Sequence, residues 1–333
     1  IYLEWECSDV INNNLPRITL RNQYTSENEF LFDIENSEEA KGFFIDDLSL
    51  YYDQIDETIA GRIIEYTLEW QGASGQSLSQ NFELQTFPVH HMVYIPSLDQ
   101  FPFGLESSNN IISNTKAFYI DKYEITNTQM ENYESNPYIK WNDYPYNDGF
   151  NYDNAMEYCS NRGSAFGGLP FTLPDEIDWE IAASAEYQDI ATYGLNFDNG
   201  NASAIYIQKY YYPTSVGNGL LNCNYANIQS CYDGTLKVGS FDGNDYQNSI
   251  SPSGLYDCSG NVKEWVNRSE LINHGQESRK ILRGGSYSSE PDDAQNISFI
   301  YESSTTTHNS FGFRTIIYAD DYIEILRNSH DKE

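Results

Sequence analysis

The chain has 333 residues, and 18 lysines and arginines against 50 aspartates and glutamates give it a formal net charge of −32. This charge argues against nucleic acids and anionic membrane surfaces as partners, because both are bound through clustered Lys and Arg side chains. Aromatic residues make up 15% of the chain, which favours folded structure over general disorder. The length predicts two domains, or one large domain with an appendage.

No run of apolar residues approaches the roughly 20 that a membrane-spanning helix needs. The sequence begins at Ile1 and shows no basic stretch followed by an apolar one. We therefore expect a processed chain, which is compatible with secretion.

Residues 1–88 predict a small all-β domain. The segment 63–70 alternates apolar and polar residues and is the clearest strand, and segments 29–34 and 43–50 are further strand candidates. Two glycines within residues 71–75 predict a turn after the clearest strand. We find no catalytic pattern in this domain and interpret it as a spacer, an assembly module or a binding module.

The chain beyond residue 88 alternates short strands with loops and has three segments of helical character, at residues 126–133, 152–161 and 175–184. Thr126 and Asp175 are typical N-cap residues, and Gly163 is a candidate for the end of the second helix. Residues 186–260 have little helical period and many Gly, Asn and Asp, so they predict long ordered loops. Loops of this length need disulfides or bound cations to hold them.

The five cysteines are Cys7, Cys159, Cys223, Cys231 and Cys258. None lie in Cys-x-x-Cys spacing, which argues against a thiolate zinc site. Cys223 and Cys231 flank a short turn-rich segment and predict a local disulfide, with two separate thiols as the alternative. A disulfide would indicate an oxidising compartment.

Four groups of segments occur in a characteristic order, at residues 92–104 with 118–127, 155–159 with 173–183, 254–266, and 282–287 with 311–314. Over residues 92–317 they resemble the formylglycine-generating enzyme, or sulfatase-modifying factor, family. The resemblance implies an α+β fold, a variant of the C-type-lectin-like fold with much irregular, calcium-stabilised loop. We expect three parts: a small β domain at 1–88, the family domain at 89–320 and a C-terminal tail at 321–333.

A first calcium site is expected in the Gly/Asn turn after residue 256. Calcium takes six to eight oxygen ligands and often mixes carboxylates with backbone carbonyls. Asp257 and Glu264, with the carbonyls of Gly260 and Val262, can supply much of that set. The resemblance implies the same four residues. The alternative is that Asp257 and Glu264 are ordinary turn acids.

The resemblance also implies a second calcium site. Its side-chain amide and the carbonyl of the following residue match Asn227 and Ile228. The remaining ligands come from a downstream acidic stretch that is shorter here, so Asp233 and Tyr232 are the candidates. We expect one or two calcium ions in the protein.

The oxidase chemistry of the family needs two cysteines shortly after the Gly-Gly-Ser-Tyr motif, because thiolates are the soft ligands that hold Cu(I). These positions are Ser289 and Ala294 here, and no cysteine follows Cys258. The aromatic residue that follows the Gly-Asn-Val turn in many relatives is Lys263. We therefore expect no copper and no catalytic residue, and an emptied groove lined by Ser286 and Ser289.

A related branch of the family, the sulfoxide synthases, uses an iron-binding histidine set. The histidines of this chain are His90, His91, His274, His308 and His330. Only His90 and His91 are adjacent, and no facial-triad spacing occurs. An adjacent pair at the domain junction is better interpreted as exposed or packed.

Arg283 and Arg314 are rare cations in this acidic chain, and we expect them to pair with buried carboxylates such as Glu180 or Glu124. Recognition of an anion is the alternative.

The polar segment 286–310 forms the edge of the groove in the family. The same surface is the diversified ligand-binding face of the retroelement variable proteins, which share this fold, and Tyr, Ser and Asn suit adaptable recognition. A solvated loop is the alternative.

The sequence thus predicts a non-catalytic, calcium-stabilised binding or structural protein on this scaffold. We expect an extracellular or cell-surface location and a bacterial source. The expected partners are a protein or glycan ligand, or further copies of the chain in an extracellular assembly. One alternative is an enzyme with altered metal-dependent oxidase chemistry in the same groove. Another is a retroelement-diversified ligand-binding protein.

Overall fold

The computed structural model describes residues 2–6, 17–22, 32–34, 41–45, 63–71, 77–85, 92–105, 110–132, 143–165, 168–189, 203–213, 216, 221–272 and 277–322. The chain forms two compact units, one of residues 1–90 with 191–202 and one of residues 91–190 with 203–333. Within the described residues, no helix is long and apolar enough to span a bilayer.

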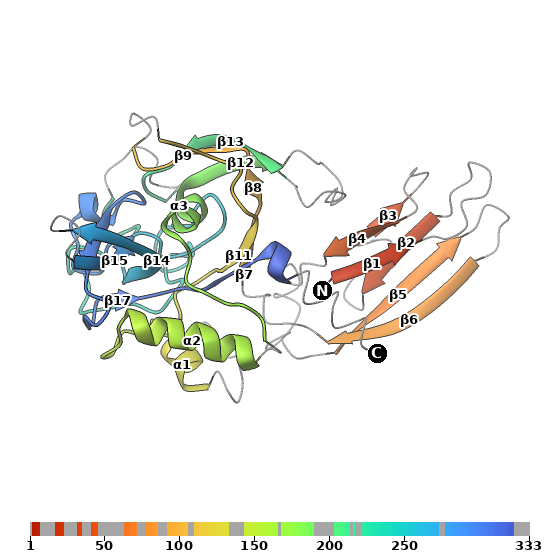
Figure 1. Ribbon diagram of the computed structural model, residues 1–333, viewed down its shortest axis with the longest axis horizontal. Coiled ribbons are helices and arrows are strands. Elements are labelled where there is room, and N and C mark those ends of the chain that lie inside the picture. The colour runs from red at the N-terminus through yellow and green to blue at the C-terminus, as the bar shows by residue number, and fades with distance from the viewer. Residues whose placement is uncertain are drawn as a thin grey trace. The chain divides into compact units, whose positions relative to one another are not determined.

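The described elements of the first unit are all strands: β1 (Tyr2–Glu6), β2 (Arg17–Asn22), β3 (Phe32–Ile34), β4 (Lys41–Ile45), β5 (Ile63–Gln71) and β6 (Ser77–Gln85). β1 pairs with β4, and an antiparallel sheet has the order β3-β2-β5-β6 (Figure 1). The alternating segment 63–70 lies in β5, which pairs with β6 along its full length. The other two strand candidates overlap β3 and β4, and their remaining residues lie outside the described part of the chain.

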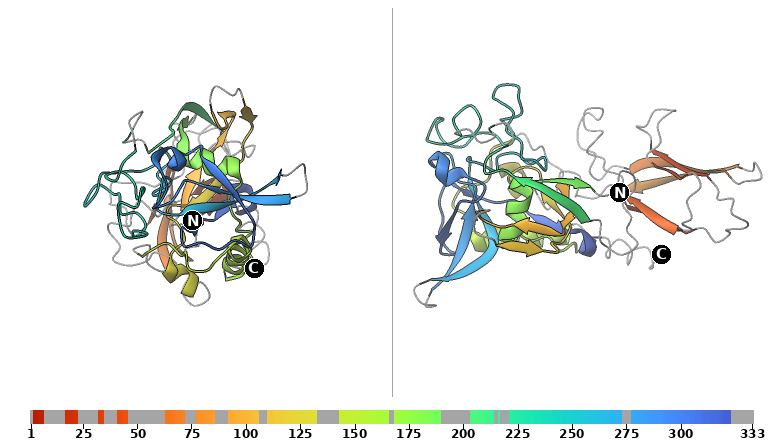
Figure 2. Two further views of the ribbon diagram at one scale, coloured as in Figure 1. Left: turned by 90° about the vertical axis from the view of Figure 1, so that its left-hand side faces the viewer. Right: turned by 90° about the horizontal axis from the view of Figure 1, so that it is seen from above.

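The second unit contains several small sheets, built from β7 (Met92–Ile95), β8 (Ser97–Leu98), β9 (Gln100–Pro102), β10 (Ile111–Ser113), β11 (Phe118–Asp121), β12 (Ala185–Asp189), β13 (Ser203–Lys209), β14 (Lys263–Ile272), β15 (Glu277–Arg283), β16 (Phe299–Glu302), β17 (Phe311–Gly312) and β18 (Ile316–Tyr318). The strand orders are β18-β11-β7, β12-β13-β8, β10-β9 and β16-β15-β14-β17. The β14–β15 hairpin extends away from the body of the unit (Figure 2). β12 and β13 correct the expectation that 186–260 is loop throughout, because the β-branched and aromatic run at 205–207 belongs to a strand.

Two helices begin where local sequence predicts. α1 (Asn127–Asn132) starts with a reciprocal cap, in which Thr126 N–H donates to Gln129 Oε1 at 2.8 Å and Gln129 N–H donates to Thr126 Oγ1 at 3.3 Å. α3 (Glu176–Ser184) starts after Asp175, whose carboxylate accepts from the N–H of Ile177 at 3.0 Å.

The end of the second helix differs from the prediction. α2 (Tyr152–Ala165) continues through Gly163 instead of ending before it. A Cβ at Gly163 would lie 2.1 Å from the carbonyl oxygen of Leu169. The glycine therefore allows the returning chain to approach the helix, which is a tertiary requirement that looks like a helix stop in the sequence.

The core of the second unit forms around α3. This helix contacts β12 on one side and β14 on another (Figure 1). Trp179 is 1% exposed, and it belongs to the same buried cluster as Ile95, Phe118 and Ile316 of the β18-β11-β7 sheet. Because α3 joins the small sheets, its polar side chains Glu176 and Glu180 are also buried and need partners there.

Candidate functional site

The Gly-Gly-Ser-Tyr motif at residues 284–287 begins with a tight turn after β15. Gly284 and Gly285 have φ values of 84° and 72°, a region that favours glycine. A Cβ at Gly285 would lie 2.7 Å from the Cα of Ala294. The turn needs glycine for both reasons, and it places Ser286 in the interior, where it is 0% exposed.

Lys263, Ser286 and Ser289 form one polar cluster at this turn. The Lys263 ammonium donates to Ser286 Oγ at 3.0 Å and to Ser289 Oγ at 3.1 Å. The backbone N–H of Ser286 also donates to Ser289 Oγ at 3.0 Å. The two serines predicted to line the groove are therefore brought together. Nothing in the sequence indicated that Lys263 contacts these serines.

The two positions that match the family's cysteines, Ser289 and Ala294, carry no sulfur. Ser289 is 7% exposed and has its hydroxyl in the cluster with Lys263. Ala294 is fully buried at the end of a short 3-10 helix, Pro291–Ala294, where it packs against the Gly284-Gly285 turn. A hydroxyl and a methyl group cannot replace the thiolates that bind Cu(I).

Lys263 is half-buried, and burial lowers the pKa of its ammonium below the usual value. Asp293 and Glu302 oppose this shift but lie beyond ion-pair distance. Among the described residues, the partners of the Lys263 ammonium are the two serine hydroxyls. Within the described part of the chain, the positive charge of Lys263 is therefore only partly compensated.

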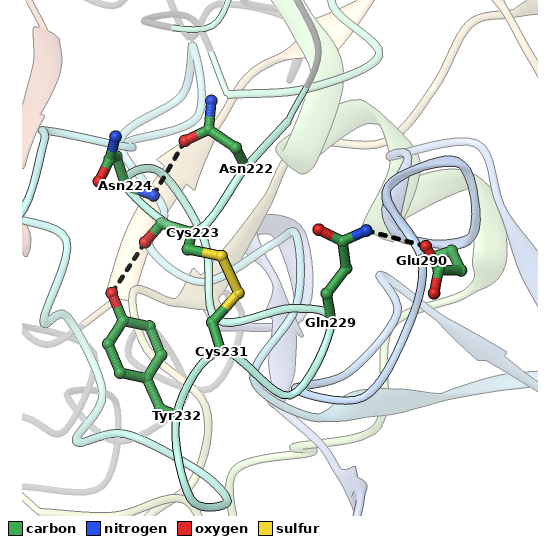
Figure 3. Close-up of a disulfide and its surroundings, with 7 residues drawn as sticks. All are labelled: Asn222, Cys223, Asn224, Gln229, Cys231, Tyr232 and Glu290. Carbon is green, nitrogen blue, oxygen red and sulfur yellow. Dashed lines mark hydrogen bonds between the residues drawn. A yellow bond between two sulfur atoms is a disulfide. The ribbon is translucent and has the colours of Figure 1, made fainter.

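A disulfide-bonded loop holds the Ser289 segment in place. Cys223 and Cys231 are joined, with 6.0 Å between their Cα atoms, which confirms the predicted pairing (Figure 3). The backbone N–H of Gln229 donates to the carbonyl of Ser289 at 2.9 Å, and the Gln229 side chain donates to Glu290 at 2.9 Å. The disulfide loop is thus hydrogen-bonded to the segment that carries Ser289. Cys159 and Cys258 are buried free thiols, and Cys7 lies outside the described residues.

The two arginines of the closing motif pair with buried carboxylates, as predicted. Arg283 bonds to Glu180 and, at 3.1 Å, to Glu176. Arg314 binds Glu264 through two nitrogens, each 2.6 Å from a carboxylate oxygen. Glu180 also accepts from the ammonium of Lys209. These pairs cross-link α3, β14, β15 and the chain before β18.

Glu124, the other carboxylate proposed for an arginine, has a different role. It is 0% exposed and accepts from Asn261 Nδ2 at 2.5 Å and from the N–H of Val262 at 3.2 Å. Burial, with the nearby charges of Asp257 and Glu264, raises its pKa well above the usual value. Burial likewise raises the pKa of Asp257 to about 6.

The first predicted calcium set fits a divalent ion poorly. Both carboxylate oxygens of Glu264 are occupied by Arg314, and one of them also accepts from Trp179 Nε1 at 2.7 Å. Asp257 Oδ2 accepts from the N–H of Gly239 at 2.6 Å. Gly260 and Val262 lie in the same buried turn. A calcium ion here would have to share Glu264 with an arginine, so this set stays a prediction.

The second predicted set has a feature that fits a cation. Asn227 is 1% exposed, and its Oδ1 is buried without a hydrogen-bond partner, while its Nδ2 donates to the carbonyl of Gly234 at 3.0 Å. The carbonyl of Ile228 accepts from the N–H of Cys231 at 3.0 Å, and Asp233 is exposed. An amide oxygen without a donor is the kind of ligand that calcium uses.

No group of three or more His, Cys, Asp or Glu side chains within the described residues could hold a metal ion. His308 bonds to Ser310 Oγ at 2.7 Å. His90, His91, His274 and His330 lie outside the described residues.

The predicted recognition segment exposes two aromatic rings. Phe299 and Tyr301 on β16 are 47% and 40% exposed, and their ring centroids lie 5.3 Å apart in an edge-to-face arrangement. β16 is an edge strand of its sheet, and no described strand pairs with its outer side. The sequence indicated the segment but not these two residues.

Comparison with known proteins then decides the family. The profile of the FGE-sulfatase family, described as a sulfatase-modifying factor enzyme 1-like domain, matches residues 78–319. The chain belongs to this family. The resemblance found in the sequence is thereby confirmed, and so is the α+β fold with its extensive irregular loops. A search among curated proteins found no match.

Three solved structures are similar to this chain at low sequence identity. CarF is 18% identical with a TM-score of 0.46, covering 69% of this chain and 98% of its own. Treponema denticola variable protein 1 is 19% identical with a TM-score of 0.45, covering 72% and 96%. PvdO from Pseudomonas aeruginosa is 17% identical with a TM-score of 0.44, covering 68% and 94%.

Proposed function

We propose that this member of the FGE-sulfatase family has lost copper–thiolate oxidation and works as a binding protein. The loss is supported by Ser289 and Ala294 at the two cysteine positions and by Lys263, whose ammonium bonds to Ser289. A hydroxyl already bonded to an ammonium is a poor ligand for a soft metal.

The exposed aromatic pair on β16 carries the binding proposal. Aromatic residues are enriched in the centres of protein interfaces and supply large contact area with few rotatable bonds. Phe299 and Tyr301 are exposed on an edge strand, and an extended peptide can add to the outer side of such a strand. We therefore propose a protein ligand that adds a strand along β16.

Panning a peptide display library against the pure protein tests this proposal. We expect enriched peptides to lose at least tenfold in affinity for the double variant Phe299→Ser/Tyr301→Ser. The matched control is Ile111→Ser, which removes another exposed apolar side chain (49% exposed) from a different sheet. Equal loss in the control would contradict the proposal.

Two further outcomes bear on the same proposal. Binding on a glycan array that depends on Phe299 and Tyr301, with no peptide enriched, would replace the protein ligand by a sugar. Oxidation of a cysteine-containing sulfatase peptide by the pure protein would overturn the loss of catalysis altogether.

We also propose that the protein binds calcium and works in an extracellular location. Each of these proposals rests on a separate observation. The buried, unpartnered Oδ1 of Asn227 favours a calcium ion there, and the Cys223–Cys231 disulfide favours an oxidising compartment. Removing calcium with a chelator should lower the melting temperature, and added calcium should restore it. Asn227→Ala should abolish the calcium effect. If the calcium effect persists in this variant, the ion binds at another site.

A further inference from the structure

The described residues include four deeply buried cations that share one property. Arg162, Lys209, Arg283 and Arg314 each form an ion pair with a buried carboxylate. This is expected, because a buried charge without a counter-charge is costly. Lys263 departs from the pattern, since no described carboxylate lies within ion-pair distance of its ammonium.

The hydrogen bonds of Lys263 leave one position open. An ammonium has three N–H donors, and two of them bond to Ser286 and Ser289. The third has no acceptor within the described part of the chain. Ser289 keeps 7% exposure and the neighbouring Ser288 is exposed, so the cluster borders solvent. An external anion could therefore approach the third N–H beside hydroxyl donors.

We propose that Lys263, with Ser286 and Ser289, binds the carboxylate group of a small acidic ligand. A charge-assisted bond to the ammonium would supply the counter-charge that the described residues do not provide there. The hydroxyl of Ser289, which keeps 7% exposure, can turn and donate to the second carboxylate oxygen, whereas Ser286, which is 0% exposed, accepts from the ammonium and holds it in place.

The surrounding charges select a singly charged anion. Asp293 and Glu302 act on Lys263 electrostatically without pairing with it, and the whole chain carries −32. A doubly charged sulfate or phosphate would meet stronger repulsion from these acids than a carboxylate would. The site is therefore expected to prefer carboxylates.

This inference goes beyond the proposed function, because it concerns a different cluster from the aromatic pair on β16. Calorimetric titration and saturation-transfer NMR of the full chain would test it, with acetate, glucuronate, glucose and sulfate as probes. We expect glucuronate and acetate to bind and glucose not to bind. Similar affinities for both acids would assign the contact to the carboxylate alone. Tighter binding of glucuronate than of acetate would indicate additional contacts to the sugar.

The variants locate the site. Lys263→Met should weaken carboxylate binding at least tenfold, and Lys263→Gln provides a second neutral variant if the first does not fold. The matched control is Lys280→Met, on the neighbouring strand β15, because Lys280 is also partly buried but lies over the ring of Tyr152 at 4.0 Å. Ser286→Ala/Ser289→Ala should weaken binding several-fold.

Three results would overturn the inference. They are no carboxylate binding by the wild-type protein, unchanged affinity in both Lys263 variants, and sulfate binding tighter than either acid. The variant Phe299→Ser/Tyr301→Ser should keep carboxylate binding, so failure of the β16 proposal and failure of this one can be told apart.

Discussion

The second unit contains two polar clusters that share neighbouring sequence motifs. They differ in how their positive charges are paired. In the first, Arg314 and Arg283 are buried and bonded to Glu264, Glu176 and Glu180. In the second, the described hydrogen-bond partners of the half-buried Lys263 ammonium are the hydroxyls of Ser286 and Ser289. Each charged side chain of the first cluster has a partner of opposite charge within the chain, which indicates a structural role. The ammonium of the second has no carboxylate partner among the described residues, and we propose that an external group supplies it.

The largest effect is expected where a completed cluster is broken. Arg314→Met leaves Glu264 buried without its cation, next to Glu124 and Asp257. Removing one partner of a buried pair costs about 3–5 kcal/mol, so we expect at least this loss in the free energy of unfolding, measured by urea denaturation. The control is Arg268→Met, whose pair with Glu176 is 35% exposed on the arginine side and should cost at most about 1 kcal/mol. Equal losses would mean that burial does not distinguish the two pairs.

The turn that places the serines should come next. Gly285→Ala introduces a Cβ at φ 72° and 2.7 Å from Ala294. A left-handed conformation costs a residue other than glycine about 1–2 kcal/mol, and the steric clash adds about 1–3 kcal/mol. We expect a loss of about 2–5 kcal/mol in thermal or urea unfolding. Gly254→Ala, which also has a positive φ but open space around its Cβ, should lose only the smaller conformational part.

Asp178 is a buried acid whose pKa is raised by burial, whereas burial lowers the pKa of Lys263. Asp178 accepts a hydrogen bond from the hydroxyl of Tyr318 at 2.7 Å, and burial raises its pKa from 3.8 to about 6. The folded state therefore holds this proton more tightly than the unfolded state, so its contribution to stability grows as the pH falls from about 6 to about 4.

Asp178→Asn removes that charge while keeping an acceptor for Tyr318. We expect the variant to be about 1–3 kcal/mol more stable than wild type at pH 8, with the difference disappearing below pH 4. Urea unfolding at several pH values measures it. A difference that does not depend on pH would show that the Asp178 charge is not the cause.

The smallest effect is expected at Lys263 itself. Lys263→Met loses two hydrogen bonds to hydroxyls but also removes a poorly compensated charge from a half-buried position. The two effects oppose each other, so the unfolding free energy should change by no more than about 1 kcal/mol. Lys209→Met, which strips a buried ion pair from Glu180, should cost about 3–5 kcal/mol. A similar cost at both lysines would make Lys263 a structural residue and remove the contrast between the clusters.

Local features were predictable from the sequence. The caps at Thr126 and Asp175 formed as expected, because they need only neighbouring residues. The disulfide between Cys223 and Cys231 joins residues eight positions apart. The order of the motifs indicated the family, and the replacement of both cysteines by Ser289 and Ala294 was visible without any structure.

Long-range packing decided the rest. Gly163 lies within α2 because a segment that follows it must come close. Glu264, which the sequence predicts as a calcium ligand, is bonded to Arg314, 50 residues away. Lys263 meets Ser286 and Ser289 because the β14–β15 pairing and the glycine turn bring their backbones together. Sequence alone determined which chemical groups this protein has and lacks. Only the tertiary structure decided which buried charges are satisfied within the chain, because that depends on distances between segments that are far apart in the sequence.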